Sequence, residues 1–331
     1  MATRENILVI RFKSIGDVVL TLPVVHALRD NFPAARITFF TVRENAPLLE
    51  GFREVDELIV LDRAALKKPL RTVPEFFRLL RRLRAGKFSR VIDLQGYGET
   101  AWLTRLTGAA QRWGSVYGQG RAWAYTRGLT RREDLHPVEW HLALLRECGL
   151  KIGKIQNRFE LPDHALAAAK KIFADHHLDD AKPTLFIQPF TSTPQKNWPL
   201  EKYLAVARHW RAQGVQIIFG GGPGDLAALE NARAKNFPVL AGVPLLVTGG
   251  LMQLSTLVLG GDTGMLHLAI AQGKRALMLV HNAAPGRPIL YQHPEWVVVA
   301  PQPNQLDSIT VETIIAETGK VFNPPAGNAS C

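Results

Sequence analysis

Short runs of apolar residues alternate with longer amphipathic stretches along this chain of 331 residues. The short runs are typical of strands buried on both faces of a parallel sheet, and the amphipathic stretches are typical of helices that cover it. In the first half the pattern predicts strands at residues 7–10, 36–42, 57–61 and 90–94, with helices at 18–28, 74–85 and 138–148. In the second half it predicts strands at 185–187, 215–219, 257–259 and 276–280, with helices at 164–173, 200–213, 226–234, 265–271 and 310–321.

The periodicity lapses between the two halves, at residues 157–163. A chain of this length exceeds one ordinary hydrophobic core, so we expect two domains, at 1–160 and 161–331. Alternating strands and helices predict an α/β fold in which each domain is a doubly wound parallel sheet. Ligands of such sheets bind beyond the carboxyl ends of the strands, which predicts a site in a cleft between the domains.

The composition is that of a globular protein without a membrane span. Hydrophobic residues make up 47% and charged residues 21%. Cys148 and Cys331 lie far apart, which leaves no disulfide framework and suits a reducing, cytoplasmic compartment. Residues 1–12 lack the features of a signal peptide. The uncharged stretch 237–261 contains prolines and paired glycines, so we expect buried strands, helices and turns there. The last residues, 324–331, predict a loose tail.

The positive charge is concentrated in the first half. Residues 1–160 hold 27 Lys and Arg against 17 Asp and Glu, whereas residues 161–331 hold 13 against 12. This asymmetry predicts an anionic partner for the first domain: a nucleic acid, a membrane surface or a phosphorylated substrate. No nucleic-acid-binding module is recognisable in the sequence, so we expect no nucleic-acid partner.

The first candidate for chemistry is the segment Lys13-Ser-Ile-Gly-Asp17, directly after the first predicted strand. Gly16 allows a ligand to approach the backbone. The start of the next helix, around Ser14, offers unpaired N–H groups. Asp17 could accept a proton from an attacking hydroxyl. The alternative is that Asp17 caps the helix, because Asp is favoured at that position.

A second candidate is the loop after the strand at 185–187. Thr191, Ser192 and Lys196 combine hydroxyls with one positive charge, which suits a phosphate group. The alternative is a polar loop in which Trp198 fills the core. The sequence alone leaves both interpretations open.

Two glycine-rich turns form further candidates. Gly260-Gly-Asp-Thr-Gly-Met-Leu-His267 joins a predicted strand to a helix whose amino terminus would attract an anion, with His267 one turn along. A lone histidine there is more often part of a core. Gly220-Gly-Gly-Pro-Gly-Asp225 matches neither a dinucleotide fingerprint nor a P-loop. Asp225 could hold a nucleotide or could cap the following helix.

Two basic segments occur in the first half. Residues 63–90 carry ten Lys or Arg, which predicts either a solvated helix face or a surface attracted to anionic lipid. Arg121, Arg127, Arg131 and Arg132 interleave with Trp123 and Tyr125. Aromatic faces suit sugar rings, and guanidinium groups suit phosphates or carboxylates.

Taken together, the motifs resemble those of glycosyltransferase family 9, the lipopolysaccharide heptosyltransferases. Residues 10–23 resemble the opening signature of that family, and Asp93-Leu-Gln-Gly96 resembles a motif of its first domain. Lys196-Asn-Trp-Pro199 and Asp262-Thr-Gly-Met-Leu-His267 resemble its donor-site motifs. The four motifs occur in the expected order, and the resemblance extends over most of the chain.

The resemblance implies a GT-B fold, in which two Rossmann-like domains face a central cleft. It implies an inverting enzyme that needs no metal ion or other cofactor and transfers heptose from ADP-heptose to the Kdo/heptose inner core of lipopolysaccharide. The first domain would bind the anionic lipid-linked acceptor, the second would bind the donor, and the last helix would cross back to the first domain. Such an enzyme would be cytoplasmic and peripherally bound to the inner face of the cytoplasmic membrane.

The motifs and the resemblance together assign roles to individual residues. Asp17 would be the general base, and Lys196 would stabilise the leaving diphosphate. The predicted donor-binding residues are Ser14, Gly16, Thr191, Ser192, Asp225, Asp262, Thr263, Gly264 and His267. The predicted acceptor-binding residues are Gln95, Arg121 and Arg127. The alternatives are a related transferase for another nucleotide sugar, an epimerase of the same fold, and a non-catalytic protein that binds nucleotide sugars.

Overall fold

The computed structural model describes residues 5–63, 69–284 and 286–322, so the tail predicted at 324–331 lies outside the described residues. The chain divides into two compact units. The first contains residues 1–160 and 285–287, and the second contains residues 161–284 and 288–331.

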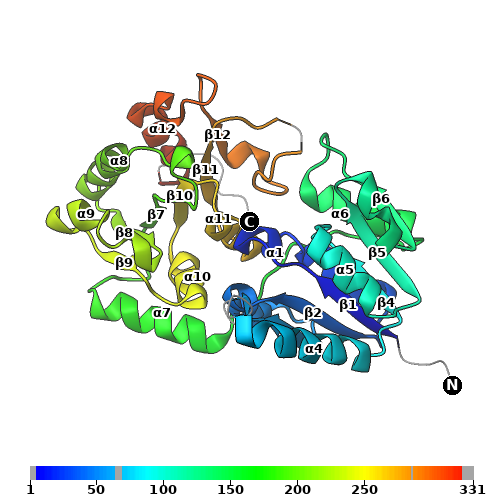
Figure 1. Cartoon of the computed structure of the whole chain (residues 1–331). Helices are drawn as coiled ribbons and strands as arrows, with labels where there is room; N and C mark the ends of the chain where they lie inside the picture. The colour runs from blue at the N-terminus through cyan, green and yellow to red at the C-terminus, as the bar shows by residue number, and fades with distance from the viewer. Residues whose placement is uncertain (1–4, 64–68, 285, 323–331) are drawn as a thin grey trace. The chain divides into compact units, whose positions relative to one another are not determined.

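The first unit is built on a parallel sheet of six strands in the order β3-β2-β1-β4-β5-β6 (Figure 1). The strands are β1 (Asn6–Ile10), β2 (Arg36–Val42), β3 (Glu57–Leu61), β4 (Arg90–Asp93), β5 (Gln111–Val116) and β6 (Arg127–Thr130). The helices are α1 (Ile15–Val19), α2 (Leu22–Asn31), α4 (Pro69–Ala85), α5 (Gly98–Leu106) and α6 (Pro137–Glu147), with 3-10 helices η1 (Arg43–Gly51) and η2 (Gln119–Ala124). Helices α4 and α5 contact each other, as do α2 and α6.

The second unit repeats this plan, with strand order β12-β11-β10-β7-β8-β9. Its strands are β7 (Thr184–Gln188), β8 (Gln216–Gly221), β9 (Val239–Ala241), β10 (Leu257–Gly261), β11 (Ala276–Val280) and β12 (Val297–Val299). Its helices are α7 (Asp163–Asp175), α8 (Leu200–Ala212), α9 (Glu230–Ala234), α10 (Leu245–Leu254), α11 (Gly264–Ala271) and α12 (Val311–Phe322). Short 3-10 helices are η3 (Pro194–Lys196), η4 (Pro223–Asp225), η5 (Pro294–Trp296) and η6 (Leu306–Ser308).

Both sheets have the Rossmann arrangement, in which the strand order reverses between the first and fourth strands of the unit. The reversals lie between β1 and β4 and between β7 and β10. The predicted α/β class with two doubly wound parallel sheets is therefore confirmed. At such a reversal, the loops that follow the two strands diverge and leave room for a ligand.

The central strands are buried because they are apolar on both faces. In the first unit, Ile7 to Ile10 of β1 are fully buried, and Leu8 and Ile10 pack in one cluster with Leu83 of α4. In the second unit, Leu185 and Ile187 of β7 pack with Trp198, Tyr203 and other residues. The strand predictions succeed where runs are this apolar.

Several element predictions need correction. The helix predicted at 18–28 is two helices, α1 and α2, because Pro23 in the first turn of α2 has no N–H for a preceding turn. The helix predicted at 226–234 is reduced to α9. The uncharged stretch 237–261 does contain β9, α10 and β10, as predicted. Among the described residues, no helix is long and apolar enough to span a membrane.

The last helix packs within the second unit. Trp210 of α8 donates a hydrogen bond from Nε1 to Thr318 Oγ1 of α12 at 2.8 Å, and its ring lies 4.8 Å from that of Phe322. The contacts named here are with α8 of the second unit, and the expected crossing of this helix to the first domain stays a prediction. The apolar face of α12 is buried against α8, and this packing holds α12 in the second unit.

A buried ion pair supports the end of the first unit. His26 Nδ1 lies 2.9 Å from Glu54 Oε1, and His26 Nε2 lies 3.3 Å from the carbonyl of Arg158. Burial alone would lower the pKa of His26, but the hydrogen bond and charge of Glu54 outweigh it and raise that pKa. The pKa of Glu54 is lowered, because the interactions with His26 outweigh its burial.

The pair is expected to make stability depend on pH. The pKa of His26 is higher in the folded than in the unfolded protein. Its contribution to the free energy of unfolding is therefore full below the unfolded-state pKa of about 6.5, and it is lost as the pH rises through the folded-state pKa. Glu54 contributes above its unfolded pKa of about 4.3. His26→Gln should therefore cost about 1–3 kcal/mol of unfolding free energy near pH 6 and less at pH 9. Denaturant unfolding at both pH values measures this cost, with exposed His176→Gln as control. An equal cost at both values would contradict the assignment.

Candidate functional site

The candidate residues gather at the carboxyl edges of the two sheets. In the first unit these are the loops after β1, β4 and β5, and in the second unit the loops after β7, β8 and β10.

Asp17 is held by three hydrogen-bond donors. Its Oδ2 accepts a hydrogen bond from the Ser14 backbone N–H at 2.7 Å and one from the Ser14 hydroxyl at 3.2 Å. Its Oδ1 lies 2.7 Å from Nη2 of Arg11. Asp17 therefore does cap the helix, as the alternative interpretation expected. It does so from the third helical position of a capping box in which Ser14 is the N-cap residue. The side chain remains 32% exposed, and each oxygen retains capacity to accept a proton.

Arg11 is a buried residue that holds the carboxylate of Asp17 in place. Its side chain is only 5% exposed, and it also donates from Nε to the Lys13 carbonyl at 2.9 Å and from Nη1 to the Leu94 carbonyl. A buried guanidinium needs acceptors for its charge to be tolerated, and each of its three nitrogens has one here. Arg11 therefore orients Asp17, a role that we did not predict for it. The available signal was a charged residue directly after an apolar strand.

The Asp93-Leu-Gln-Gly96 turn is structural in this unit. Asp93 is fully buried and accepts hydrogen bonds from the N–H groups of Gln95 and Gly96, both at 2.9 Å, and from the Tyr125 hydroxyl at 2.7 Å. Burial raises the pKa of the Asp93 carboxyl. Gly96 has φ of +66°, and a Cβ there would lie 2.1 Å from the Ser115 carbonyl oxygen. Only glycine fits this turn.

Gln95 links that turn to the loop that carries Asp17. Its Oε1 accepts hydrogen bonds from the N–H groups of Phe12 and Lys13, at 3.0 and 2.9 Å, and the side chain is 2% exposed. We predicted Gln95 as an acceptor-binding residue. Its contacts show a second role, which is to hold the loop after β1 in place.

The two predicted acceptor arginines are not brought together. Arg121 follows β5 and donates from Nη1 to the Gly96 carbonyl at 3.0 Å, so it lies at the carboxyl edge. Arg127 begins β6 and donates to the Glu147 carbonyl at 2.9 Å, at the opposite edge of the sheet. The chain must return to the amino edge between them because β5 and β6 are parallel. Arg131 instead follows β6 at the carboxyl edge, 5.2 Å from the Tyr117 ring centre.

At the second edge, Lys196 and Asp262 form a close ion pair. Lys196 Nζ lies 2.6 Å from Asp262 Oδ2, and His267 Nε2 lies 3.9 Å from Asp262 Oδ1. Burial alone would raise the pKa of Asp262, but the nearby His267 and Lys196 outweigh it and lower that pKa. The Asp262 carboxylate is 21% exposed and the Lys196 side chain 42% exposed. Asp262 thus positions Lys196, whose ammonium group can bind an anion.

The paired glycines of this turn accommodate the neighbouring loop. A Cβ at Gly260 would lie 2.5 Å from the Gln188 carbonyl oxygen, and one at Gly261 would lie 2.9 Å from both the Lys196 carbonyl oxygen and the Thr191 methyl group. The glycines therefore bring the loop after β7 against the end of β10. This contact places Thr191 and Lys196 beside Asp262.

The loop after β7 has both a structural and an exposed part. Trp198 is fully buried and donates to the Ile309 carbonyl at 3.1 Å, so the core role considered for it is confirmed. The Thr191 hydroxyl donates to the Thr193 carbonyl at 2.8 Å, and Ser192 is exposed. Of the two predicted hydroxyls, Ser192 is the one with its surface open to solvent.

Thr263 and Gly264 begin α11 beside this ion pair. Thr263 is the N-cap residue in extended conformation, and no side chain caps the first turn. The N–H groups at the start of the eight-residue helix therefore add partial positive charge next to Lys196. His267 lies one turn along and is 4% exposed.

Asp225 acts as a cap in the loop after β8. Its Oδ2 accepts a hydrogen bond from the Gly222 N–H at 2.8 Å, as the alternative interpretation proposed. His281, which follows β11, lies at the same edge, with Nε2 2.7 Å from the Gln195 carbonyl oxygen. We gave His281 no role, although a polar residue directly after a buried strand was a usable signal. Within the described parts of the chain, no group of three or more His, Cys, Asp or Glu residues is placed to hold a metal ion.

Two Rossmann sheets, each with polar residues gathered where its strands end, are the arrangement of the GT-B fold. The model of glycosyltransferase family 9 (heptosyltransferase) matches residues 76–311, which is more than half of the chain. The chain belongs to this family.

Curated relatives and solved structures agree with that assignment. The chain is 26% identical over 266 residues to lipopolysaccharide heptosyltransferase 3 of Escherichia coli, covering 77% of each chain. It is 23% identical to the lipopolysaccharide core heptosyltransferase OpsX of Haemophilus influenzae, covering 89% of this chain and 84% of that one. A family 9 glycosyltransferase from Veillonella parvula has the same fold, with a TM-score of 0.85 at 22% identity, covering 97% of this chain and 98% of that one. The structure of E. coli heptosyltransferase WaaC with ADP has a TM-score of 0.78 at 21% identity, covering 95% of this chain and 99% of that one.

Proposed function

We propose that this glycosyltransferase moves heptose from ADP-heptose to the Kdo/heptose inner core of lipopolysaccharide, with inversion at the anomeric carbon and without a required metal ion. The second unit would bind the donor and the first would bind the acceptor. The observation that carries the proposal is the cluster of Lys196, Asp262 and His267 beside the uncapped start of α11. This cluster offers a cation and free N–H groups to a diphosphate.

The proposed reaction is a direct displacement. Asp17 takes the proton from an acceptor hydroxyl as the hydroxyl oxygen attacks the anomeric carbon of the donor. The bond from that carbon to the β-phosphate oxygen breaks, and ADP leaves with the electron pair. Lys196 and the N–H groups of α11 stabilise the charge on the departing diphosphate, which is the role a metal ion has in other transferases. The reaction requires the two carboxyl edges to meet around the substrates.

The acceptor side of the proposal is supported by charge. Arg121 and Arg131 lie at the carboxyl edge of the first sheet, in the half of the chain that carries nearly all the excess positive charge. An acceptor with phosphate and carboxylate groups on a lipid anchor complements that edge. Such an acceptor would bring the protein to the inner face of the cytoplasmic membrane as a peripheral protein.

A nucleotide-sugar panel tests the donor. ADP-heptose should raise the unfolding temperature of the protein and be consumed when core lipopolysaccharide lacking heptose is added, with release of ADP. At about 100 times its dissociation constant, a ligand stabilises the folded state by roughly 2.7 kcal/mol. Stabilisation by a UDP-sugar instead would identify a different donor. Binding of ADP-heptose without any transfer would indicate a non-catalytic binding protein.

A further inference from the structure

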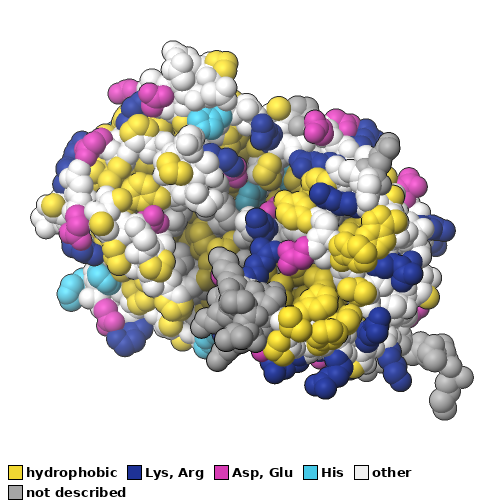
Figure 2. Space-filling model, in the orientation of Figure 1, with side chains coloured by type: hydrophobic (Ala, Val, Ile, Leu, Met, Phe, Trp, Pro, Cys, Tyr) yellow, Lys and Arg dark blue, Asp and Glu magenta, His cyan; other side chains and the backbone are white. Residues whose placement is uncertain are grey.

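The first unit has an exposed apolar surface whose side chains are not among the predicted site residues, although its η2 part also carries Arg121. Among the described residues, six of the eight large hydrophobic side chains that are exposed belong to α4, the start and middle of α5, and η2. These residues, which we call the aromatic face, are Val73, Phe76, Phe77, Tyr97, Trp102 and Trp123. Figure 2 shows hydrophobic side chains gathered over α4 and α5, bordered by Lys and Arg. A patch of this kind normally marks an interaction surface.

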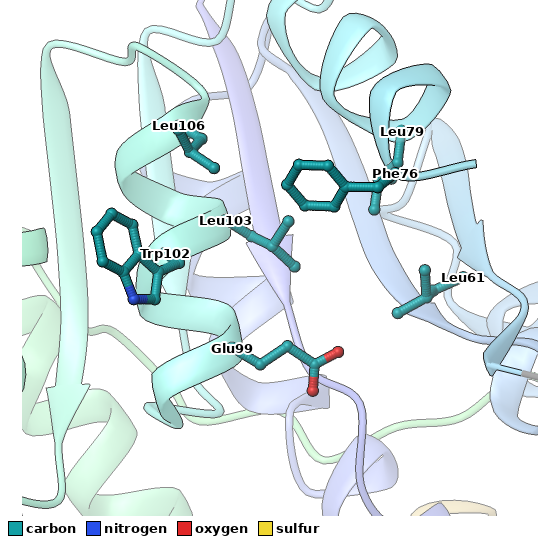
Figure 3. Close-up of a pocket in the computed structure, with 7 residues that line it drawn as sticks. All are labelled: Leu61, Phe76, Leu79, Glu99, Trp102, Leu103 and Leu106. Carbon is teal, nitrogen blue, oxygen red and sulfur yellow. The ribbon is translucent and has the colours of Figure 1, made fainter. Parts of the chain in front are cut away.

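Two residues of the aromatic face, Phe76 and Trp102, line an open groove between α4 and α5. The groove has a volume of about 420 Å³ and is lined by Leu61, Phe76, Leu79, Glu99, Trp102, Leu103 and Leu106. Figure 3 shows Phe76 on α4 pointing toward α5 across the groove. Glu99 is the one charged residue in the lining, and it is paired with Arg63 at 2.9 Å. The groove is therefore apolar and almost free of uncompensated charge.

The side chains of the aromatic face are not needed for the core. On α4, Leu83 is fully buried and Leu79 packs against the core, so these two residues attach the helix to the sheet. Phe77 is 62% exposed and Trp102 is 58% exposed. The Trp102 and Trp123 rings contact each other at 4.5 Å between centres. Leaving such aromatic surface in water costs free energy, which a partner would recover.

Arginines accompany the exposed aromatic residues in a regular way. Arg81 lies four residues after Phe77 on α4, and Arg105 lies three residues after Trp102 on α5, so each cation shares a helix face with an aromatic ring. Arg84 donates from Nε to the Leu106 carbonyl at 3.2 Å, at one end of the groove. An apolar centre with a cationic border is complementary to a bilayer that has anionic headgroups above its acyl chains.

We propose that the aromatic face and its groove insert into the surface of an anionic phospholipid bilayer, and that the arginines of α4 and α5 bind the headgroups. The groove takes acyl-chain carbons, Trp102 and Trp123 lie at the level of the headgroups, and Arg81 and Arg105 bind phosphates. The proposal deepens the proposed action at a membrane by naming the surface that makes the contact. It concerns the bulk phospholipid and not the acceptor.

The test is binding to vesicles in the absence of sugar donor and acceptor. The full chain should bind vesicles of equimolar phosphatidylglycerol and phosphatidylcholine, and bind vesicles of phosphatidylcholine alone much more weakly. Phe77→Ala with Trp102→Ala should lower the partition coefficient about tenfold or more, because two exposed aromatic side chains no longer transfer into lipid. Arg81→Glu should lower it to a similar extent on the anionic vesicles only.

Matched controls come from the second unit. Leu226 is 40% exposed, so Leu226→Ala removes an exposed apolar side chain outside the aromatic face, and Arg208→Glu on α8 reverses an exposed charge there. Neither control should change vesicle binding more than about twofold, since only charges and apolar groups near the lipid contribute. Unfolding temperatures of all variants, measured alongside, identify any that are misfolded.

Insertion has its own spectroscopic readout, which does not depend on a variant that loses affinity. Phospholipids brominated on the acyl chain should quench the tryptophan emission of the bound protein, and Trp102→Phe should remove much of that quenching. Bound protein without quenching, or equal loss of binding in the Leu226 control, would overturn the proposal. Vesicle binding that appears only when acceptor lipid is added would also overturn it. A dimer in which the groove is the contact between two copies of the chain would do the same. Because none of these measurements follows sugar transfer, their outcomes are independent of whether the proposed transfer reaction occurs.

Discussion

Asparagine in place of Asp17 is expected to lower the rate of sugar transfer by about 10²–10⁴-fold, because the amide cannot take the proton of the acceptor hydroxyl. The amide oxygen can still accept the hydrogen bond from the Ser14 N–H, so the turn after β1 should persist. Single-turnover transfer with saturating donor measures the effect, and calorimetry measures ADP affinity. We expect ADP affinity to stay within about threefold of the wild-type value, since Asp17 belongs to the acceptor side of the reaction.

The control for Asp17 is a second aspartate that only supports a turn. Asp179 accepts a hydrogen bond from the Ala181 N–H at 3.0 Å in an exposed loop of the second unit. Asp179→Asn should leave transfer unchanged. If Asp17→Asn transfers sugar at nearly the wild-type rate, the residue is a helix-capping group alone and the general base is elsewhere.

Methionine in place of Lys196 is expected to raise the barrier to transfer by about 3–4 kcal/mol, as when one preorganised group at a developing charge is removed. ADP binding should weaken markedly as well, since the cation that faces the diphosphate is gone. The variant also leaves the mostly buried carboxylate of Asp262 without the ammonium group of Lys196. The uncompensated charge lowers the stability of the fold, and this in turn reduces transfer and ADP binding. The single variant therefore needs a companion that separates the two causes.

The companion is the double variant Lys196→Met with Asp262→Asn. It removes the uncompensated carboxylate, so its unfolding free energy should recover toward that of the wild type. Transfer and ADP binding should not recover, because no cation has been restored. Recovery of ADP affinity together with stability would show that Lys196 matters only as the partner of Asp262.

The sequence predicts the architecture well because strongly apolar strands leave little choice. Strands such as β1 (NILVI) and β7 (TLFIQ) have apolar, buried centres, which is the pattern of a sheet covered on both faces. Two of the strands that were missed lack this signal. Strand β5 (QRWGSV) mixes polar residues and a glycine, and the short edge strand β6 (RGLT) is mostly exposed. Their pairing comes from neighbouring strands and not from their own periodicity.

The candidate site was predictable in position but less so in residue roles. Motifs directly after strands lie together at a sheet edge, which is why Lys196 and Asp262 meet although 66 residues separate them. Arg127 was misplaced because spacing along the chain does not show at which edge a strand begins. Arg11 was missed because its importance comes from burial and from three acceptors that only the fold brings together.

The most direct test of the account is calorimetric titration of ADP into the wild-type protein, Asp17→Asn and Lys196→Met side by side. The account assigns the diphosphate to the carboxyl edge of the second sheet and the proton acceptor to the first. It therefore predicts wild-type ADP affinity in Asp17→Asn and strongly reduced affinity in Lys196→Met. Wild-type affinity in Lys196→Met, or loss of ADP binding in Asp17→Asn, would contradict it.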